Sequence, residues 1–303
     1  MEAIINNASL RHDFVILFDV TDGNPNGDPD NDNLPRTDPE TGQGLVTDVC
    51  LKRKVRDYVS AVKEGEATYR IYVQKNDVAL IAKHEDAYAD LKIKSTGTKQ
   101  KKEDVSAAQK WMCEKFFDVR SFGAVMSVGV NCGQVRGPLQ LTFARSMDRV
   151  FAYDLTITRV AVTKKEDAEI SVGEDDKGKG KQTEMGRKAL LPYGLYRGYG
   201  FFNPLLAKGT GFTDSDLALF WEALQGMFDL DHSASHGLMG LKGLYIFSHD
   251  RPTGLAPAHK LFDRIEIAKK PEVDSPRKFS DYNVNVNESD LPDGVTLARV
   301  VEG

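Results

Sequence analysis

A loop rich in Gly, Pro, Asn and Asp, followed at once by a basic segment, is the part of this sequence best suited to binding chemistry. Residues 21–56 read TDGNPNGDPDNDNLPRTDPETGQGLVTDVCLKRKVR. The first part favours tight turns and hydrogen bonds from side chains to the backbone. The second part predicts a helix that starts after Thr47 and carries Lys52, Arg53, Lys54 and Arg56 in its first turns. Loop amides and hydroxyls beside a basic helix start are suited to gripping phosphates.

The same loop carries three alternate carboxylates, Asp28, Asp30 and Asp32, which permit a metal-binding interpretation. They match the opening of a calcium loop, but Asn33 stands where the turning glycine belongs and Pro39 where the closing Glu is needed. A solvated acidic turn therefore fits better than a calcium-stabilised structural site. Clustered Asp residues also hold magnesium for phosphodiester cleavage, so a metal-dependent endoribonuclease that uses an acid of this loop stays open as an alternative.

A second basic group follows the strongly polar segment 164–182. This segment has almost no apolar residues and several glycines, so we expect it to project as a mobile hairpin tip. Met185, Gly186, Arg187 and Lys188 come soon after it. A methionine can wedge beside a base while the cations hold phosphates, so this group predicts a second clamp on a nucleic acid.

The composition is that of a folded globular protein, with 41% hydrophobic and 28% charged residues in a chain of 303. The sequence shows no run of about 18 apolar residues and no secretory leader, so we expect no membrane partner and a cytoplasmic location. The three cysteines include no Cys-x-x-Cys pair, which predicts reduced, mostly buried thiols. We expect no cofactor and no bound metal.

The net charge of -5 hides an uneven distribution of charge. Residues 1–50 hold two Lys or Arg against ten Asp or Glu, whereas residues 51–120 hold sixteen against eleven. Residues 121–200 hold twelve against nine, and residues 201–303 hold ten against fifteen. The basic middle indicates a surface for a polyanion, and the acidic ends are suited to meeting a basic neighbour.

Hydrophobic patterns predict the elements that position these groups. Residues 12–20 predict a central strand, and residues 49–62 predict a helix with one apolar stripe and a basic edge. Residues 68–75 alternate and predict a second strand, which gives the strand, helix, strand order of half a ferredoxin-like fold. Further helices are predicted over 79–91, over 106–119 and after a Thr213 cap, and further strands over 121–130, 137–145, 155–163, 243–248, 282–286 and 295–301.

Long ordered motifs resemble the backbone subunit of type I-C CRISPR Cascade, Cas family seven, within the repeat-associated mysterious protein superfamily. The motifs that carry the resemblance are GNPNGDP (23–29), LPRTD (34–38), LVTDVCLKRKVR (45–56), FGAVM (122–126), GQVRGP (133–138), MGRK (185–188), PYGLY (192–196) and AHKLF (258–262). In related subtypes the helix after the loop begins Ser-Ser-Gln-x-Leu-Lys-Arg-x-x-Arg. Lys52, Arg53 and Arg56 match that frame, whereas Asp48 and Val49 depart from it.

The resemblance implies an α+β fold: an RNA-recognition-motif or ferredoxin-like palm over residues 1–75 and 119–303. A helical finger-like insertion would occupy residues 76–118, and a β-hairpin thumb would occupy residues 163–192 within the palm. It also implies RNA-binding residues, which we expect to be Asn24, Asn26, Gly27, Arg36, Thr47, Lys52, Arg53, Arg56, Gln134, Arg136, Met185, Gly186, Arg187, Lys188 and Arg197.

The function implied is that of a scaffold without catalytic residues. Copies of the chain would bind guide RNA along its phosphate backbone, polymerise head to tail into a helical filament and present the guide in segments to target DNA. The expected partners are the CRISPR guide RNA, the paired target DNA strand, further copies of the chain, other Cascade subunits and a recruited helicase-nuclease.

Overall fold

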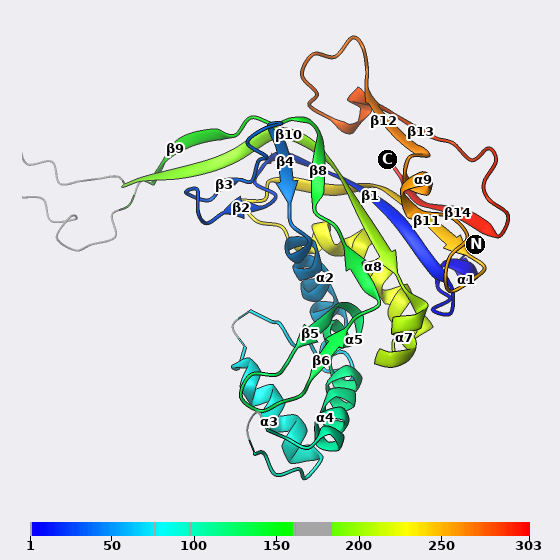
Figure 1. Cartoon of the computed structure of the whole chain (residues 1–303). Helices are drawn as coiled ribbons and strands as arrows, with labels where there is room; N and C mark the ends of the chain where they lie inside the picture. The colour runs from blue at the N-terminus through cyan, green and yellow to red at the C-terminus, as the bar shows by residue number, and fades with distance from the viewer. Residues whose placement is uncertain (1, 76, 97–98, 160, 162–183) are drawn as a thin grey trace, which may run out of the picture.

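The fold is built around β1 (Arg11–Gly23), which lies in the middle of an antiparallel sheet. A computed structural model describes residues 2–75, 77–96, 99–159, 161 and 184–303. In that part of the chain β1 pairs with β10 (Glu184–Phe202) on one side and with β11 (Leu238–His249) on the other. The strand order is β14-β11-β1-β10-β8-β4, and β7 and β9 also pair with β10 (Figure 1). The strand predicted over 12–20 is therefore confirmed, as is a mixed α+β fold.

The remaining strands are short or lie toward the edges. The sheet is completed by β4 (Gln43–Val46), β7 (Leu139–Leu141), β8 (Ala144–Arg149), β9 (Tyr153–Arg159) and β14 (Val295–Glu302). Three separate pairs are formed by β2 (Gly27–Asp28) with β3 (Leu34–Pro35), β5 (Gly123–Val125) with β6 (Gln134–Arg136), and β12 (Ile265–Lys269) with β13 (Tyr282–Val286).

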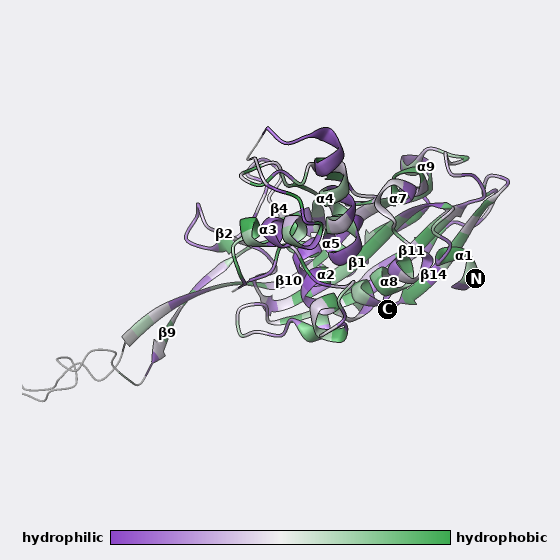
Figure 2. Cartoon of the chain, turned by 90° about the horizontal axis from the view of Figure 1, so that it is seen from below, coloured by the Kyte–Doolittle hydropathy of each residue, from purple (hydrophilic) through white to green (hydrophobic). Residues whose placement is uncertain are grey.

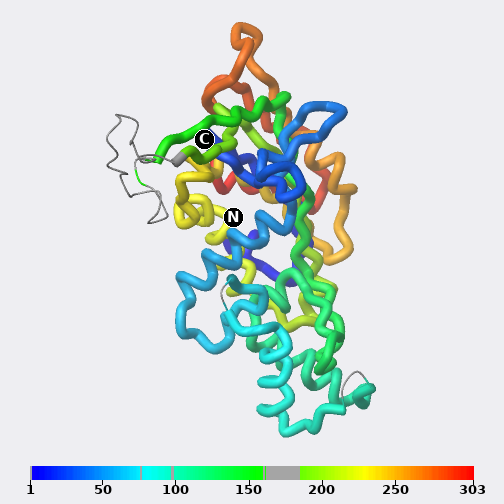
Figure 3. The backbone as a smooth tube through the Cα atoms, turned by 90° about the vertical axis from the view of Figure 1, so that its left-hand side faces the viewer, coloured from blue at the N-terminus to red at the C-terminus, as the bar shows by residue number. Residues whose placement is uncertain are grey.

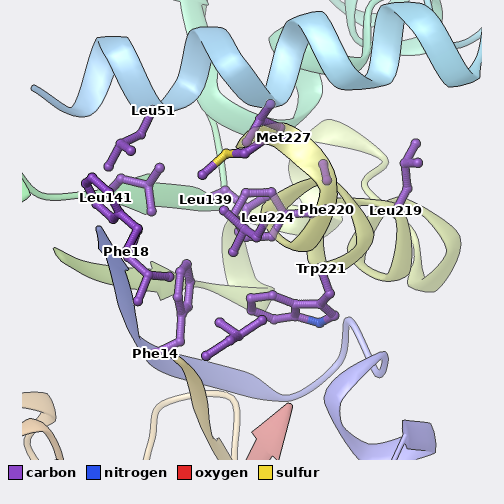
Figure 4. Packing of buried hydrophobic residues seen from close by; sticks show 14 of the residues in the cluster. Phe14, Phe18, Leu51, Leu139, Leu141, Leu219, Phe220, Trp221, Leu224 and Met227 are labelled. Carbon is purple, nitrogen blue, oxygen red and sulfur yellow. The ribbon is translucent and has the colours of Figure 1, made fainter. Parts of the chain in front are cut away.

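Two helices cover one face of the sheet. Alternate side chains of β1, Phe14 and Phe18 among them, point toward α2 (Asp48–Val62) and α8 (Asp214–Leu230) and are fully buried. Figure 4 shows this packing, with Trp221 and Met227 of α8 between β1 and α2. The predicted Thr213 cap is confirmed, because Thr213 and Asp216 form a capping box at the start of α8.

The opposite face of the sheet is covered by smaller elements. Val15 and Leu17 of β1 pack with residues of α9 (Ala258–Phe262) and of the β12–β13 pair. A single turn, η1 (Phe279–Asp281), precedes β13. The central strands are predominantly coloured hydrophobic in Figure 2, as burial on both faces requires. The strands predicted over 243–248, 282–286 and 295–301 are confirmed.

A helical unit separates α2 from β7 and has its own apolar cluster. It contains α3 (Leu80–Asp90), α4 (Lys102–Lys115) and α5 (Phe117–Phe122), and its core includes Tyr88, Trp111 and Met112. It lies at the end of the molecule away from the β12–β13 pair (Figure 3). The helices predicted over 79–91 and 106–119 are confirmed, although a break near Phe116 divides the second into α4 and α5.

The strand predicted over 68–75 is wrong. Within this segment only Arg70 forms a β-bridge, with Phe116. The backbone N–H groups of Tyr72 and Val73 donate instead to the Asp118 carboxylate, at 2.7 and 3.0 Å. Lys83 Nζ donates to the carbonyls of Ile71 and Tyr72, both at 2.8 Å. Because side chains satisfy these backbone groups, the segment needs no neighbouring strand.

Two smaller helices and a long hairpin complete the chain. Trp221 Nε1 donates to the Ile5 carbonyl at 2.9 Å and holds α1 (Glu2–Ile5), while α7 (Pro204–Thr210) follows β10. β9 and the first part of β10 form an arm that projects from the sheet (Figure 1). The strand predicted over 155–163 is confirmed as far as Arg159, and the predicted mobile tip at 164–182 lies outside the described residues.

The cysteines and helices agree with two further expectations. All three cysteines are free, and Cys113 and Cys132 are buried. Of the helices in the described ranges, none combines the length and apolar character needed to cross a bilayer.

A buried histidine predicts a pH dependence of stability. His12 Nε2 donates to the Asn7 carbonyl at 3.0 Å, so in the neutral ring Nδ1 accepts from Ser248 Oγ at 2.8 Å. Burial lowers the pKa of His12 from 6.5 to about 4. The unfolded chain therefore binds a proton below pH 6.5 that the folded chain does not bind until about pH 4. This stabilisation, about 3 kcal/mol, is present above pH 6.5 and is lost as the pH falls to 4.

We expect His12→Gln to show a smaller loss of stability between pH 7 and pH 4 than the wild type does, measured by urea unfolding. His232→Gln, at an exposed position, is the control and is expected to keep the wild-type pH profile. Parallel profiles for wild type and His12→Gln would contradict the prediction.

Candidate nucleic-acid interface

The Gly-rich and Asp-rich loop, residues 24–46, holds the start of α2 in place through hydrogen bonds. Asn26 Oδ1 accepts from both the backbone N and the Oγ1 of Thr47, each at 3.0 Å. Thr47 Oγ1 in turn accepts from the Cys50 N–H at 3.3 Å and caps the helix. Asn24 is buried and donates to the Asn33 carbonyl at 2.7 Å. The predicted residues Asn24, Asn26 and Thr47 are therefore brought together, with their side-chain oxygens already engaged.

Gly27 lies on β2, and Arg36 directly follows β3. A Cβ on Gly27 would lie 2.0 Å from Asn33 Oδ1, so a larger residue there would have to displace the Asn33 side chain. Arg36 Nη1 pairs with Asp28 at 3.2 Å. Its buried Nε has no hydrogen-bond partner in the described parts of the chain. Among the described residues, the Arg36 guanidinium therefore keeps a hydrogen-bond donor without a partner at Nε.

Two of the three predicted basic residues of α2 point inward. Lys52 Nζ contacts Asp48 at 3.1 Å and Gln140 at 3.3 Å. Arg56 Nε donates to Asp118 Oδ2 at 2.7 Å. Both cations lie over the Phe122 ring, at 5.6 and 5.3 Å. Only Arg53, with a side chain 60% exposed, lies on the predicted basic edge.

Asp118 is a structural residue that could not be recognised from the sequence. Its buried carboxylate accepts from Arg56, Tyr72 and Val73 and so joins α2, α5 and the start of the helical unit. The segment that contains it, FDVR, reads simply as part of a helix. Its partners are 62, 46 and 45 residues away, so no local spacing could have revealed them.

Gln134 and Arg136 lie on β6, beside the helical unit. Both side chains are exposed, and the Gln134 carbonyl accepts from Gln109 Nε2 of α4 at 2.6 Å. β6 pairs with β5, where Gly123 has a φ of 85° and lies so close to the chain that a Cβ would be 2.4 Å from the Val135 carbonyl oxygen. This turn presents Arg136 to solvent.

The predicted clamp at 185–188 is divided between two faces of the β9–β10 arm. Met185 pairs with Thr158 and Arg187 with Thr156, whereas Gly186 and Lys188 pair with Ile157 and Leu155 on the other face. Met185 is 80% exposed. Arg187 forms an ion pair with Asp154 and still has a side chain 71% exposed. Met185 and Arg187 therefore lie on one face of the arm, and Lys188 lies on the other.

The arm leaves the sheet beside the loop. Thr21 pairs with Tyr193 and Gly23 with Leu191, directly before the loop begins. β3 also contacts β10, as the neighbouring labels in Figure 1 show. Loop 24–46, the first turns of α2 and the root of the arm therefore lie together, with Val49 and Arg53 exposed on α2. Met185 and Arg187 lie further out along the arm, beyond the residues of β10 that pair with β1.

Arg197 lies elsewhere. It pairs in register with Leu17, which belongs to the apolar cluster on the face opposite α2 and α8. Its Nη1 donates to the Ile265 carbonyl at 3.4 Å, and its guanidinium lies 5.3 Å from the Tyr199 ring. The predicted residues therefore occupy two faces of the sheet.

The three loop carboxylates are held as a turn. Asp28 Oδ1 accepts from the Asp30 N–H at 3.3 Å, and Asp32 and Asn33 have left-handed φ angles of 48° and 59°. Within the described ranges, no group of three or more His, Cys, Asp or Glu side chains is arranged to hold a metal ion. The endoribonuclease alternative gains no support from this geometry.

Comparison with known proteins places this α+β chain among the CRISPR-associated proteins. The family model described as CRISPR-associated protein Cas7 matches residues 10–287, so the chain belongs to the Cas7 family. A protein of Haloferax volcanii described as "CRISPR-associated protein Cas7" is 26% identical over 244 residues, which are 71% of this chain and 64% of that protein. The chain thus spans less than two thirds of this relative's length.

Solved structures of CRISPR complexes are also similar. A chain of "CRISPR RNA-guided surveillance complex, pre-nicking" gives a TM-score of 0.49 at 17% identity, covering 81% of this chain and 83% of that one. A chain of "CRISPR RNA-guided surveillance complex" gives 0.44 at 17% identity, covering 80% and 71%. These TM-scores lie below 0.5, and the family assignment rests on the family model.

The junction at Asp118 predicts a large cost for its loss. Asp118→Ala removes the acceptor of three donors and leaves the Arg56 charge unpaired, so we expect a loss of about 3 kcal/mol in the free energy of unfolding. Asp86→Ala is the control, because its carboxylate is 58% exposed and lies 3.6 Å from Arg70. We expect that change to stay within about 0.5 kcal/mol. Equal losses in the free energy of unfolding for the two variants, measured by urea titration, would contradict the structural role of Asp118.

Proposed function

We propose that this chain is the guide-binding backbone subunit of a type I-C CRISPR surveillance complex. The observation that carries the proposal is the projecting β9–β10 arm beside the capped, Arg53-bearing start of α2, in a chain of the Cas7 family. Met185 and Arg187 on one face of the arm offer an apolar wedge and a cation to a single strand. Contacts to phosphates, sugars and stacked bases suit a guide of any sequence.

The fold supports a palm with two additions. Along the chain β1, α2, β8, β10, α8 and β11 follow the βαββαβ order of a ferredoxin-like unit. In the sheet their order is β11-β1-β10-β8, with every pair antiparallel. We assign this unit as the RNA-recognition-like palm, the helical unit between α2 and β7 as the finger and the β9–β10 arm as the thumb. The second palm strand is then β8, beyond the finger.

Head-to-tail association accounts for the arm and for the charge distribution. On the arm the side chains of Leu155 and Ile157 are 45% and 50% exposed. A surface that meets a different surface on the next copy generates a filament unless the rotation closes. The acidic N-terminal fifty residues and the basic middle are complementary for such contacts. Other Cascade subunits, target DNA and a recruited helicase-nuclease complete the set of partners, in the cytoplasm and without catalysis by this chain.

Guide binding is tested with exposed cations rather than with Lys52 and Arg56, whose loss would also disturb packing. We expect Arg53→Ala, Arg136→Ala and Arg187→Ala together to weaken guide RNA binding. The slope of log affinity against log salt should fall by about 2 units, because three phosphates on a single strand lose their partners. Filter-binding titrations at several salt concentrations measure both. Arg251→Ala, at an exposed turn, is the control, and an unchanged slope in the triple variant would refute the proposal.

Self-association is tested at the acidic loop. Asp30 is exposed, and its side chain is not needed for the Asp28–Arg36 pair. If this loop meets the basic middle of the next copy, Asp30→Lys should shorten guide-bound filaments, as seen by electron microscopy or light scattering. Asp293→Lys, at an exposed position before β14, is the control. Filaments of wild-type length in Asp30→Lys would exclude this loop from the interface.

A further inference from the structure

A strip of alternating aromatic, basic and apolar residues runs along β8 toward β9. Alternate residues of a strand face the same side of the sheet. The pairing of β8 with β4 shifts register between Arg145 and Arg149, and the connection to β9 continues the strip. We call these residues the β8 strip: Phe143, Arg145, Met147, Arg149, Phe151 and Tyr153. Phe143, Phe151 and Tyr153 are 51%, 74% and 48% exposed. One exposed aromatic side chain is ordinary, but several along one strip indicate an interaction surface.

Two cavities adjoin the strip. The first, about 400 Å³, is lined by Phe143, Arg145 and Met147 together with Arg197 and Tyr199 of β10. The second, about 490 Å³, is lined by Arg149, Phe151 and Tyr153 together with residues that include Tyr193, Tyr282 and Arg277. Each cavity therefore has aromatic walls and at least two arginines at its border.

The strip lies on the sheet face opposite α2. Arg145 pairs in register with Arg197, and Arg197 with Leu17, whose side chain belongs to the cluster under α9. The strip is thus separated by the sheet from the helix start and from Arg53.

The charges of the strip favour an anion. Arg145 and Arg197 are directly opposite one another across two strands, an arrangement that repels unless an anion bridges it. Asp38 lies 2.7 Å from Arg145 Nη1 and offsets one of these two charges, and the Arg145 side chain stays 51% exposed. In the described parts of the chain neither the Arg149 nor the Arg277 guanidinium forms an ion pair, although the Arg277 backbone N–H donates to Asp281 at 2.7 Å. Of the acids lining the second cavity, Asp148 accepts from the Tyr282 hydroxyl at 2.7 Å, and Asp274 is exposed.

We propose that the β8 strip is a second binding site for single-stranded nucleic acid, with phosphates on Arg145, Arg149 and Arg197 and bases stacked on Phe143 and Phe151. A single strand is required, because only unpaired bases reach the rings with their faces. The inference rests on the proposed function and adds a binding surface on the face away from α2. The guide and a second strand share this chemistry, and the test separates them.

The test uses Arg149→Ala with Phe151→Ala in the full chain, since both side chains are exposed and their loss leaves the core intact. Arg251→Ala with Leu205→Ala is the matched control, with one exposed cation and one exposed apolar residue elsewhere. Fluorescence anisotropy is measured in two arms. In one, labelled guide RNA is titrated; in the other, labelled single-stranded DNA is titrated onto protein saturated with guide RNA.

We expect the strip variant to lose at least 10-fold in affinity in one arm, because a stacked base and a phosphate contact are removed. The control variant should bind as the wild type does. A loss in the RNA arm assigns the strip to the guide, and a loss in the DNA arm assigns it to a second strand. Photo-crosslinking of a 4-thiouridine or 4-thiothymidine probe should label the peptide that contains Phe151.

Three results would overturn the inference. If the strip variant binds as the wild type in both arms while the Arg53, Arg136 and Arg187 variant loses affinity, the inference about the β8 strip is refuted and the proposed function is supported. If wild-type protein binds neither probe, the proposed function falls and the strip with it. If polyglutamate of equal charge binds the strip as tightly as DNA does, the surface serves an acidic protein segment and not a nucleic acid.

Discussion

The burial of β1 on both faces is the constraint on which the rest of the structure depends. All nine residues from His12 to Val20 are buried, with α2 and α8 on one side and α9 with the β12–β13 pair on the other. The middle of the sheet therefore has no free face for a nucleic acid. The surfaces proposed for a nucleic acid accordingly lie outside it, on the loop after β1, the arm that extends β10, β6 and the outer strands β8 and β4.

Buried ion pairs fix the helical unit to this core. They involve Lys and Arg residues that the charge distribution of the sequence alone would suggest as RNA-binding residues. Asp118 takes Arg56 of α2, and Arg120 binds Asp216 at the start of α8 with contacts of 3.1 and 2.6 Å. Breaking such a pair leaves an unpaired charge in a dry site, which costs far more than losing an exposed pair. Lys52 likewise lies against Asp48 and Gln140. The positive charge of α2 thus divides into structural cations and the exposed Arg53.

The parts of the fold that local patterns determine could be predicted from the sequence. The strand at 12–20, the helix at 49–62 and the Thr213 cap depend on apolar periodicity and on neighbours three residues apart. The segment 68–75 was predicted wrongly because its alternation is real but its hydrogen-bond partners, Asp118 and Lys83, are distant side chains. Similarly, the run 185–188 gave no sign that Met185 and Arg187 face away from Lys188, since the pairing register with β9 decides the faces.

The residues predicted to bind RNA lie on two faces of the sheet. A single continuous groove would place Arg197 beside Arg53, yet the sheet lies between them, so one strand cannot touch both without passing around an edge. The β8 side is open toward such an edge, since β4 beyond it is only four residues long. The strand predicted over 137–145 ends at Arg145, whereas β8 continues to Arg149. The aromatic and basic residues of the β8 strip indicate a binding site only because β10 places Arg197 and Tyr199 beside them.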